Sequence, residues 1–168
     1  TYCGQTNLPS PCTDGAVYQD LNPNFFRFGC YTAGTLGFTI SPDDVTANYN
    51  WQLFDVTNTN PVDIFTNVNL FVACNWASDP GETGASSDGI NTMVCTGPGL
   101  PLFSKMPDLQ AGRSYILMVT NHSGTTAGYQ LNFGGGSAVI SDAIDPHMQV
   151  AELSCDRTQL SIRLNKQV

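Results

Sequence analysis

Charged residues are scarce in this chain of 168 residues. They make up 12% of it, about half the share that is usual in globular proteins. Lysine and arginine together number six against fourteen aspartates and glutamates, so the net charge is −8. Nucleic acids and anionic lipids are bound through clustered cations. We therefore expect neither as a partner, whereas divalent cations are compatible with this charge.

Long apolar runs are also missing. No run approaches the roughly 20 residues that a membrane-spanning helix needs, and no signal peptide is present. The chain begins with TYCGQTN, which suits a mature N-terminus from which such a peptide has been removed. We therefore expect no direct insertion into a membrane, and the removal of such a peptide would be typical of an extracellular or cell-surface protein.

Helical patterns are absent as well. No window combines the periodicity of an amphipathic helix with flanking caps. Glycine (16) and proline (10) are frequent, and short apolar runs alternate with turn-forming residues. Since 41% of the residues are hydrophobic, the chain can bury a core. The pattern predicts about eight short strands in an all-β fold, a β-sandwich or jelly roll.

The clearest strands have alternating or continuous apolar residues. We expect them at 25–32, 35–41, 49–57 and 70–76, and as a hairpin within 114–135. In the third strand Trp51 and Leu53 share one face, and Phe54 and Val56 share the other. The hairpin has two core strands, Tyr115–Val119 and Tyr129–Phe133, joined by a polar turn.

Six cysteines are present, and none is spaced as a CxxC zinc motif. Their even number in an acidic, loop-rich chain indicates an oxidising compartment. Cys74 and Cys95 bracket a polar loop, and a disulfide between them would stabilise the fold by roughly 3 kcal/mol. Cys3 and Cys12 are a second candidate pair. The alternative for Cys74 and Cys95 is two buried thiols.

A catalytic site is not predicted. A hydrolase needs a nucleophile held beside a base, and the only histidines are His122 and His147. Neither lies near a nucleophile-elbow sequence, because GxSxG is absent from the chain. We therefore expect no enzyme activity.

One group of oxygen-bearing side chains is a candidate calcium site. Calcium takes six to eight oxygen ligands, often from loops. Asp43, Asp44, Asn48 and Asp55 lie close together in the sequence and supply the right donors. They do not follow the EF-hand pattern, and Asp and Asn also form ordinary turns. Calcium is therefore a candidate cofactor.

A second acidic group lies in the polar loop 76–94. Asp79, Glu82 and Asp88 belong to it, and Trp76 stands at its start beside the end of a strand. Loops on rigid β scaffolds commonly carry recognition, so we interpret this loop as the recognition surface. An exposed Trp76 could stack on a sugar ring, while a buried Trp76 would be part of the core.

A longer stretch carries a family resemblance. CYTAGTLGFTISPDDVTANYNWQLFDVTNTNPVDIFTNVNLFVACNW resembles a module near the N-terminus of very large Bacteroidetes surface proteins. Those proteins end in a gliding-motility-associated, type-B sorting domain read by the type IX secretion system. The pattern L-x-A-G-x-x-Y-x-L-x-V with G-Y-x-L-x-F is also similar to the pre-peptidase C-terminal β-sandwich. The match covers roughly residues 1–147.

The resemblance implies a non-catalytic, adhesin-like structural or recognition module that binds polysaccharide or another surface protein. The alternative is a carbohydrate-binding accessory module of a secreted hydrolase. Residues 148–168 would then form a linker and the truncated start of an Ig-like domain, with further domains beyond it. Cys155 would find its partner outside the chain, which leaves five cysteines in the first module. One of these five would be free or paired elsewhere, and Cys30 is the candidate because it lies within an apolar strand.

Overall fold

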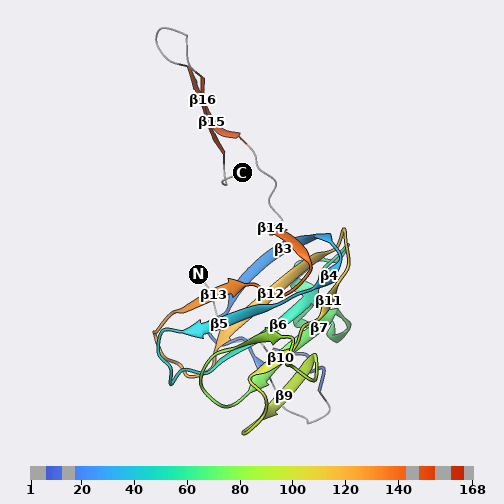
Figure 1. Ribbon diagram of the computed structural model, residues 1–168, viewed down its shortest axis with the longest axis vertical. Coiled ribbons are helices and arrows are strands. Elements are labelled where there is room, and N and C mark those ends of the chain that lie inside the picture. The colour runs from blue at the N-terminus through green and yellow to red at the C-terminus, as the bar shows by residue number, and fades with distance from the viewer. Residues whose placement is uncertain (1–6, 13–17, 143–147, 154–159, 165–168) are drawn as a thin grey trace.

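The computed structural model describes residues 7–12, 18–142, 148–153 and 160–164. It confirms an all-β fold with two main sheets packed as a sandwich (Figure 1). The six-stranded sheet contains, in spatial order, β14 (Val139–Asp142), β3 (Asn24–Thr32), β12 (Ser114–Asn121), β6 (Tyr49–Asp55), β7 (Phe71–Ala77) and β9 (Met93–Gly97). The four-stranded sheet contains β10 (Phe103–Lys105), β8 (Thr83–Ser86), β5 (Phe38–Pro42) and β13 (Tyr129–Phe133).

The main hydrophobic core lies between these two sheets. Trp51 and Leu53 of β6 point into it and are fully buried. The ring of Trp51 contacts that of Phe38 from β5, with centroids 4.8 Å apart. Phe54 and Val56 point to the opposite face and belong to a second cluster. The alternation predicted for this strand is therefore confirmed.

The second cluster buries the outer face of the six-stranded sheet. The layer that covers it consists of β1 (Asn7–Leu8), β2 (Tyr18–Gln19) and the 3-10 helices η1 (Pro61–Phe65) and η2 (Val68–Leu70). This layer contributes the buried side chains of Leu8, Tyr18, Ile64 and Leu70. Since β6 and β12 are covered on both faces, nearly all of their side chains are buried, including the polar ones of Asn50 and Gln52.

The chain alternates between the two sheets from β7 to β10. Strand β9 runs parallel to β7 in one sheet, and β10 runs parallel to β8 in the other. The prediction of one polar loop over 76–94 is therefore wrong, because β8 and the start of β9 lie within it. The small residues of β8 give no apolar alternation. Gly84 is nevertheless needed there, since a Cβ would lie 2.1 Å from the carbonyl oxygen of Phe38.

The predicted hairpin within 114–135 is wrong in its pairing. Both strands exist, but β12 pairs with β3 and β6, whereas β13 pairs with β5 in the other sheet. The polar turn between them therefore crosses from one sheet to the other. A sequence pattern with two alternating runs does not distinguish a hairpin from such a crossing.

One more sheet edge and two more strand pairs are present in the described residues. Strand β14, which the sequence did not predict, pairs with β3 at the edge of the larger sheet. Strands β4 (Gly34–Thr35) and β11 (Asp108–Leu109) form a short antiparallel pair. Strands β15 (Met148–Leu153) and β16 (Leu160–Leu164) form a two-stranded sheet of their own. The start of an Ig-like domain there stays a prediction, and Cys155 and His147 lie outside the described residues.

Candidate functional site

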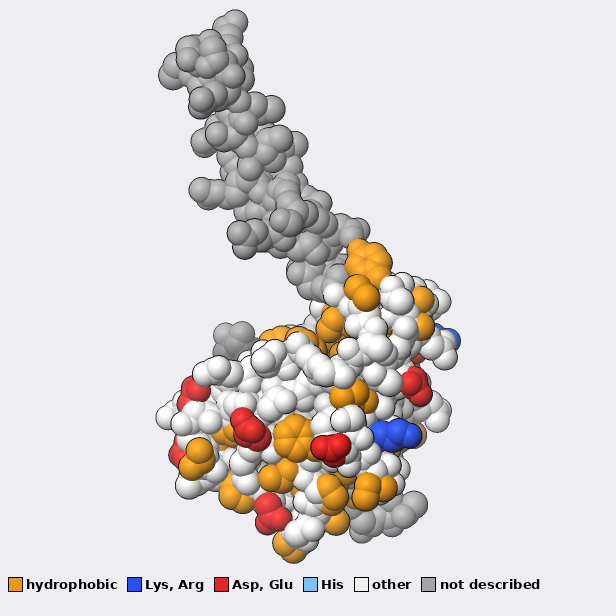
Figure 2. All heavy atoms as spheres, viewed as in Figure 1, with side chains coloured by type: hydrophobic (Ala, Val, Ile, Leu, Met, Phe, Trp, Pro, Cys, Tyr) orange, Lys and Arg blue, Asp and Glu red, His pale blue; other side chains and the backbone are white. Residues whose placement is uncertain are grey.

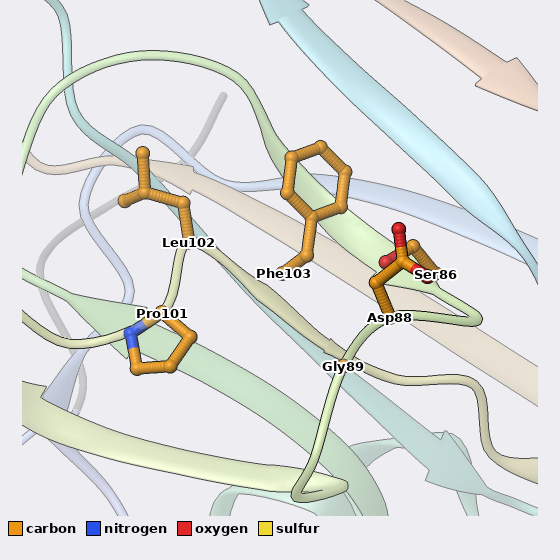
Figure 3. Close-up of a pocket in the computed structure, with 6 residues that line it drawn as sticks. All are labelled: Ser86, Asp88, Gly89, Pro101, Leu102 and Phe103. Atoms are coloured by element: carbon orange, nitrogen blue, oxygen red, sulfur yellow. The ribbon is translucent and has the colours of Figure 1, made fainter.

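A pocket of about 430 Å³ opens beside β8 and β10 of the four-stranded sheet (Figure 3). We call it the edge pocket, and it is lined by Ser86, Asp88, Gly89, Pro101, Leu102 and Phe103. The next residue, Ser104, is fully buried between the sheets. Because successive side chains of a strand point to opposite faces, Phe103 points to the outside. Figure 3 shows the apolar side chains on one side and those of Ser86 and Asp88 on the other.

The turn that follows β8 holds Asp88 beside this apolar surface. The amide of Gly89 donates to the carbonyl oxygen of Ser86 at 3.3 Å, and that of Lys105 donates to the carbonyl of Asn91 at 2.8 Å. A Cβ at Gly89 would lie 2.2 Å from the amide nitrogen of Lys105. The turn therefore packs directly on the backbone of β10 and places Asp88, whose side chain is exposed, at the pocket rim.

The floor of the edge pocket is tied to the other sheet by buried hydrogen bonds. The hydroxyl of Ser104 donates to the carbonyl oxygen of Cys74 at 2.8 Å. The amide nitrogen of Asn75 donates to the Ser104 hydroxyl at 3.2 Å and to the carbonyl of Pro101 at 3.0 Å. Satisfied buried polar groups of this kind fix one arrangement of the elements that they join. The strand behind the pocket is therefore rigidly placed.

A second cavity, of about 460 Å³, lies where the connection between β12 and β13 meets β6 and the start of β3. We call it the loop cleft. Its lining is Asn22, Asn24, Tyr49, Asn121, Gly124, Thr125, Thr126, Ala127, Gly128 and Tyr129. All of these side chains are neutral, and the polar ones are amides, hydroxyls and phenols.

Asn121 and Tyr49 hold the loop cleft in shape. The buried amide of Asn121 donates to the Tyr49 hydroxyl at 3.2 Å and to the carbonyl oxygen of Thr125 at 2.9 Å. The Tyr49 hydroxyl in turn donates to the carbonyl of Ala127 at 2.6 Å. The backbone of the crossing connection is therefore fixed by side chains that belong to two strands of the larger sheet.

The two phenols of the loop cleft stay protonated at physiological pH. Burial, followed by the neighbouring Tyr49, raises the pKa of Tyr129 to about 12, although a hydrogen bond with Asn24 opposes the shift. Burial also raises the pKa of Tyr49, while a hydrogen bond with Asn121 acts against it. The two rings lie with centroids 4.9 Å apart. Both hydroxyls therefore remain neutral hydrogen-bonding groups.

The four predicted calcium ligands do not form one site. Asp55 lies at the far end of β6 from Asn48 and pairs with Arg113, with 2.7 Å between Oδ2 and Nη1. The carboxylate of Asp44 caps its own turn by accepting from the amide and hydroxyl of Thr46, which lowers its pKa. Within the described parts of the chain, no group of three or more His, Cys, Asp or Glu is placed to hold a metal ion.

Asn48 and Asp43 instead organise loops. The amide nitrogen of buried Asn48 donates to the carbonyl oxygens of Ala77 and Asp79, at 2.9 and 2.7 Å. The backbone amide of Asp43 donates to the carbonyl of Gly128 at 2.9 Å. These contacts connect the end of β6 with neighbouring loops, so the same oxygen-rich residues serve as structural links.

Of the predicted recognition residues, Asp88 lines the edge pocket. Trp76 is 3% exposed and its ring lies 4.0 Å from that of Tyr18, so the prediction of a sugar-stacking Trp76 is wrong. The physical reason is the covering layer at the outer face of β7. Asp79 accepts from the amide of Gly99 at 2.6 Å, and Glu82 accepts from the Ser41 hydroxyl at 2.6 Å.

The disulfide is also different from the prediction. Cys95 is bonded to Cys12, so the pairs Cys74–Cys95 and Cys3–Cys12 are both wrong. Cys74 lies opposite Met93 in the parallel β7–β9 ladder, and its sulfur is 3.6 Å from the sulfur of Met93. The N-terminal segment covers this side of the sheet and brings Cys12 to Cys95. Cys3 itself lies outside the described residues.

Cys30 is buried in β3 and forms no disulfide with the part of the chain that the structure describes. Its thiol donates to the carbonyl oxygen of Thr32 at 3.1 Å. Burial raises the pKa of this thiol, so it remains in the unreactive protonated form.

No family model, curated protein or solved structure matches this chain. The resemblance to Bacteroidetes surface modules therefore stays a prediction from the sequence. Within the described ranges, no helix has the length and apolar character that a membrane crossing requires. The edge pocket and the loop cleft are the features from which we infer a function.

Most residues of both cavities were missed by sequence reasoning. The run Pro101–Phe103 stands between turn-forming residues, and this short apolar stretch was the available signal for the edge pocket. The loop cleft had no local signal, since it combines residues from Asn22 to Tyr129. Only the sheet order, which places β3, β12 and β6 side by side, brings them together.

Proposed function

We propose that this chain is a non-catalytic recognition module of a secreted or cell-surface, adhesin-like protein, and that it binds a protein partner at the edge pocket. One observation carries the proposal. Apolar side chains of Pro101, Leu102 and Phe103 gather beside the carboxylate of Asp88 in an open pocket on a rigid sheet.

This arrangement fits a partner segment that places a lysine or arginine next to an apolar side chain. The apolar surface favours contact because it releases water when it is covered. A carboxylate pairs more strongly with a cation when neighbouring apolar groups exclude solvent. Asp88 and Phe103 would therefore act together, one selecting charge and the other supplying contact area.

The whole molecule favours the same kind of partner. A net charge of −8 attracts cationic segments at long range and increases their association rate. Figure 2 shows acidic side chains scattered among apolar ones on one face, with little positive charge in view. Because the buried bonds of Asn75 and Ser104 already fix the pocket floor, binding costs little ordering.

An exported setting is supported by the Cys12–Cys95 disulfide, because such bonds persist in oxidising compartments. The sequence resemblance to surface proteins agrees with that setting. A gliding or attachment role of the parent protein rests on the resemblance alone.

Selection of phage-displayed peptides on the immobilised chain tests the proposal. We expect enriched peptides to carry lysine or arginine close to an aromatic or aliphatic residue. Phe103→Ala and Asp88→Asn should each weaken their binding by roughly tenfold, which corresponds to one good contact of about 1.4 kcal/mol.

Matched controls come from the same chain. Phe25→Ala removes a half-exposed phenylalanine of β3, and Asp108→Asn removes an exposed carboxylate of β11. Both should leave peptide binding unchanged. The proposal is wrong if no peptide is enriched, or if enriched peptides bind the Phe103→Ala chain as tightly as the parent.

A further inference from the structure

The loop cleft has a lining that differs from the rest of this acidic molecule. It contains no charged side chain, although the chain carries a net charge of −8. Its donors and acceptors are the amides of Asn22 and Asn24, the hydroxyls of Thr125 and Thr126, and the phenol of Tyr129. Such groups both donate and accept hydrogen bonds, which is what a ligand rich in hydroxyl groups requires.

The size of the cleft fits a small ligand. Its volume of about 460 Å³ falls within the roughly 300–1,000 Å³ that is typical of small-molecule sites. The ring of Tyr129 adds an apolar surface beside the polar groups. Sugars combine hydroxyl groups with apolar ring faces, and mixed linings of this kind match both parts.

The cleft is also formed before a ligand arrives. The bonds of Asn121 and Tyr49 hold the crossing connection, and Gly124 supplies the left-handed backbone (φ +68°) that the turn after β12 needs. A preformed site loses little conformational entropy on binding. The exposed groups of Asn24 and Thr126 remain at its surface.

We propose that the loop cleft binds a neutral carbohydrate. Neutral lining groups satisfy sugar hydroxyls without burying an unpaired charge. Uronic acids and sulfated sugars are repelled by the net negative charge, and the cleft offers them no cation. The site shares no residue with the edge pocket, so this inference goes beyond the proposed protein contact and does not depend on it.

Isothermal titration of the whole chain with a panel of oligosaccharides tests the inference. The neutral members are oligomers of glucose, xylose, mannose and N-acetylglucosamine, and the anionic member is an oligogalacturonate. We expect at least one neutral oligosaccharide to bind. Asn24→Ala and Tyr129→Phe should each weaken that binding by roughly tenfold, the usual effect of losing one hydrogen bond to a polar ligand group.

The controls repeat the same chemical changes elsewhere. Asn132→Ala changes an exposed asparagine of β13, and Tyr31→Phe changes a tyrosine of β3 that is 68% exposed. Neither should alter sugar binding, and Phe103→Ala in the edge pocket should not alter it either. Thermal unfolding of each variant shows that the fold is intact.

Three outcomes would overturn the inference. One is that no neutral oligosaccharide binds at millimolar concentration. Another is that the oligogalacturonate binds more tightly than every neutral member. The third is that Asn132→Ala or Tyr31→Phe reduces binding as much as the cleft variants do. Peptide selection at the edge pocket is independent of these results, so either proposal can fail alone.

Discussion

Asp55 and Arg113 form an ion pair where β6 ends, with 2.7 Å between the charged atoms. Burial by itself would raise the pKa of Asp55, but hydrogen bonds with Thr57 and with the guanidinium of Arg113 together outweigh it and lower the pKa. The folded chain therefore favours the charged form of Asp55 over the protonated form more strongly than the unfolded chain does. As a result, the contribution of Asp55 to stability depends on pH.

We expect Asp55→Asn to lower the free energy of unfolding at neutral pH by about 0.5–1 kcal/mol, since the pair is partly exposed. Because the pKa of Asp55 is lower in the folded chain than in the unfolded chain, its contribution to stability is fully present above the unfolded-state pKa. That contribution is lost as pH falls through the folded-state pKa. The difference from the parent should therefore shrink as pH falls below the ordinary aspartate pKa and disappear below the lowered pKa of the folded chain. Urea unfolding at neutral and acid pH measures this.

The control for that experiment is Asp108→Asn at an exposed position of β11, which should change stability little at either pH. A difference for Asp55→Asn that stays constant into the acid range would show that packing, and not the charge, accounts for the loss.

At the scale of elements, the disulfide joins the N-terminal segment to the edge strand β9. Cys12 and Cys95 are separated by 83 residues in the sequence, and a loop of that length predicts a stabilisation of about 4–5 kcal/mol on the chain-entropy model. We expect reduction of the parent, or the double change Cys12→Ser and Cys95→Ser, to lower the urea midpoint accordingly. Unfolding curves with and without reductant measure the effect.

A peptide map under non-reducing conditions provides the independent check on that bond. The peptide with Cys12 should be linked to the peptide with Cys95, and the link should vanish on reduction. A linked pair that joins Cys74 to Cys95 would restore the pairing predicted from the sequence and contradict the structure.

Strand β8 depends on close contact between backbones. A Cβ at Gly84 would lie 2.1 Å from the carbonyl oxygen of Phe38, and its φ of +154° disfavours other residues. We therefore expect Gly84→Ala to destabilise the fold by about 2 kcal/mol or more. Gly134→Ala is the matched control, because nothing lies within 4 Å of its Cβ position. Thermal unfolding compares the two, and equal midpoints would contradict the expectation.

The elements differ in how far the sequence could predict them. Strand β6 was predictable because its large side chains are buried on alternate faces, as with Trp51 and Phe54. Strand β8 was not, because its small residues obtain their burial from the neighbouring strands β5 and β10. The crossing from β12 to β13 has the sequence pattern of a hairpin, because the sheet to which a strand belongs depends on distant partners and does not alter its local alternation.

The candidate site residues also differ in how far the sequence could predict them, depending on whether local or distant residues position them. Asp88 could be proposed from the loop sequence because a short turn positions it locally. The prediction of an exposed Trp76 is wrong because Tyr18, which lies far away in the sequence, packs against its ring. The loop cleft is lined by side chains that lie between Asn22 and Tyr129 in the sequence and that the sheet order brings together. No local sequence pattern predicts that these residues are close in space.

At the scale of the whole molecule, two cavities of different chemistry share one rigid scaffold. The edge pocket carries a carboxylate, whereas the loop cleft is neutral. Both belong to a chain with a net charge of −8. The field of the whole chain should therefore act on a cationic ligand at the edge pocket and hardly at all on an uncharged ligand at the cleft.

Salt should therefore separate the two binding events. Raising ionic strength shortens the Debye length to about 10 Å at 0.1 M and about 3 Å at 1 M, so a cationic peptide should bind the parent more weakly, mainly through slower association. Binding of a neutral oligosaccharide should change little over the same range. Surface plasmon resonance with the peptide and titration with the sugar, both in a sodium chloride series, measure the contrast.

The variant Asp88→Asn tests how much of that salt effect is local. It removes one charge at the edge pocket and leaves a net charge of −7 from the original −8, so the peptide should bind more weakly while its association still slows with salt. If salt had the same effect on peptide and sugar, the effect would come from the fold as a whole. The long-range field could then not be the reason why a cationic partner is favoured.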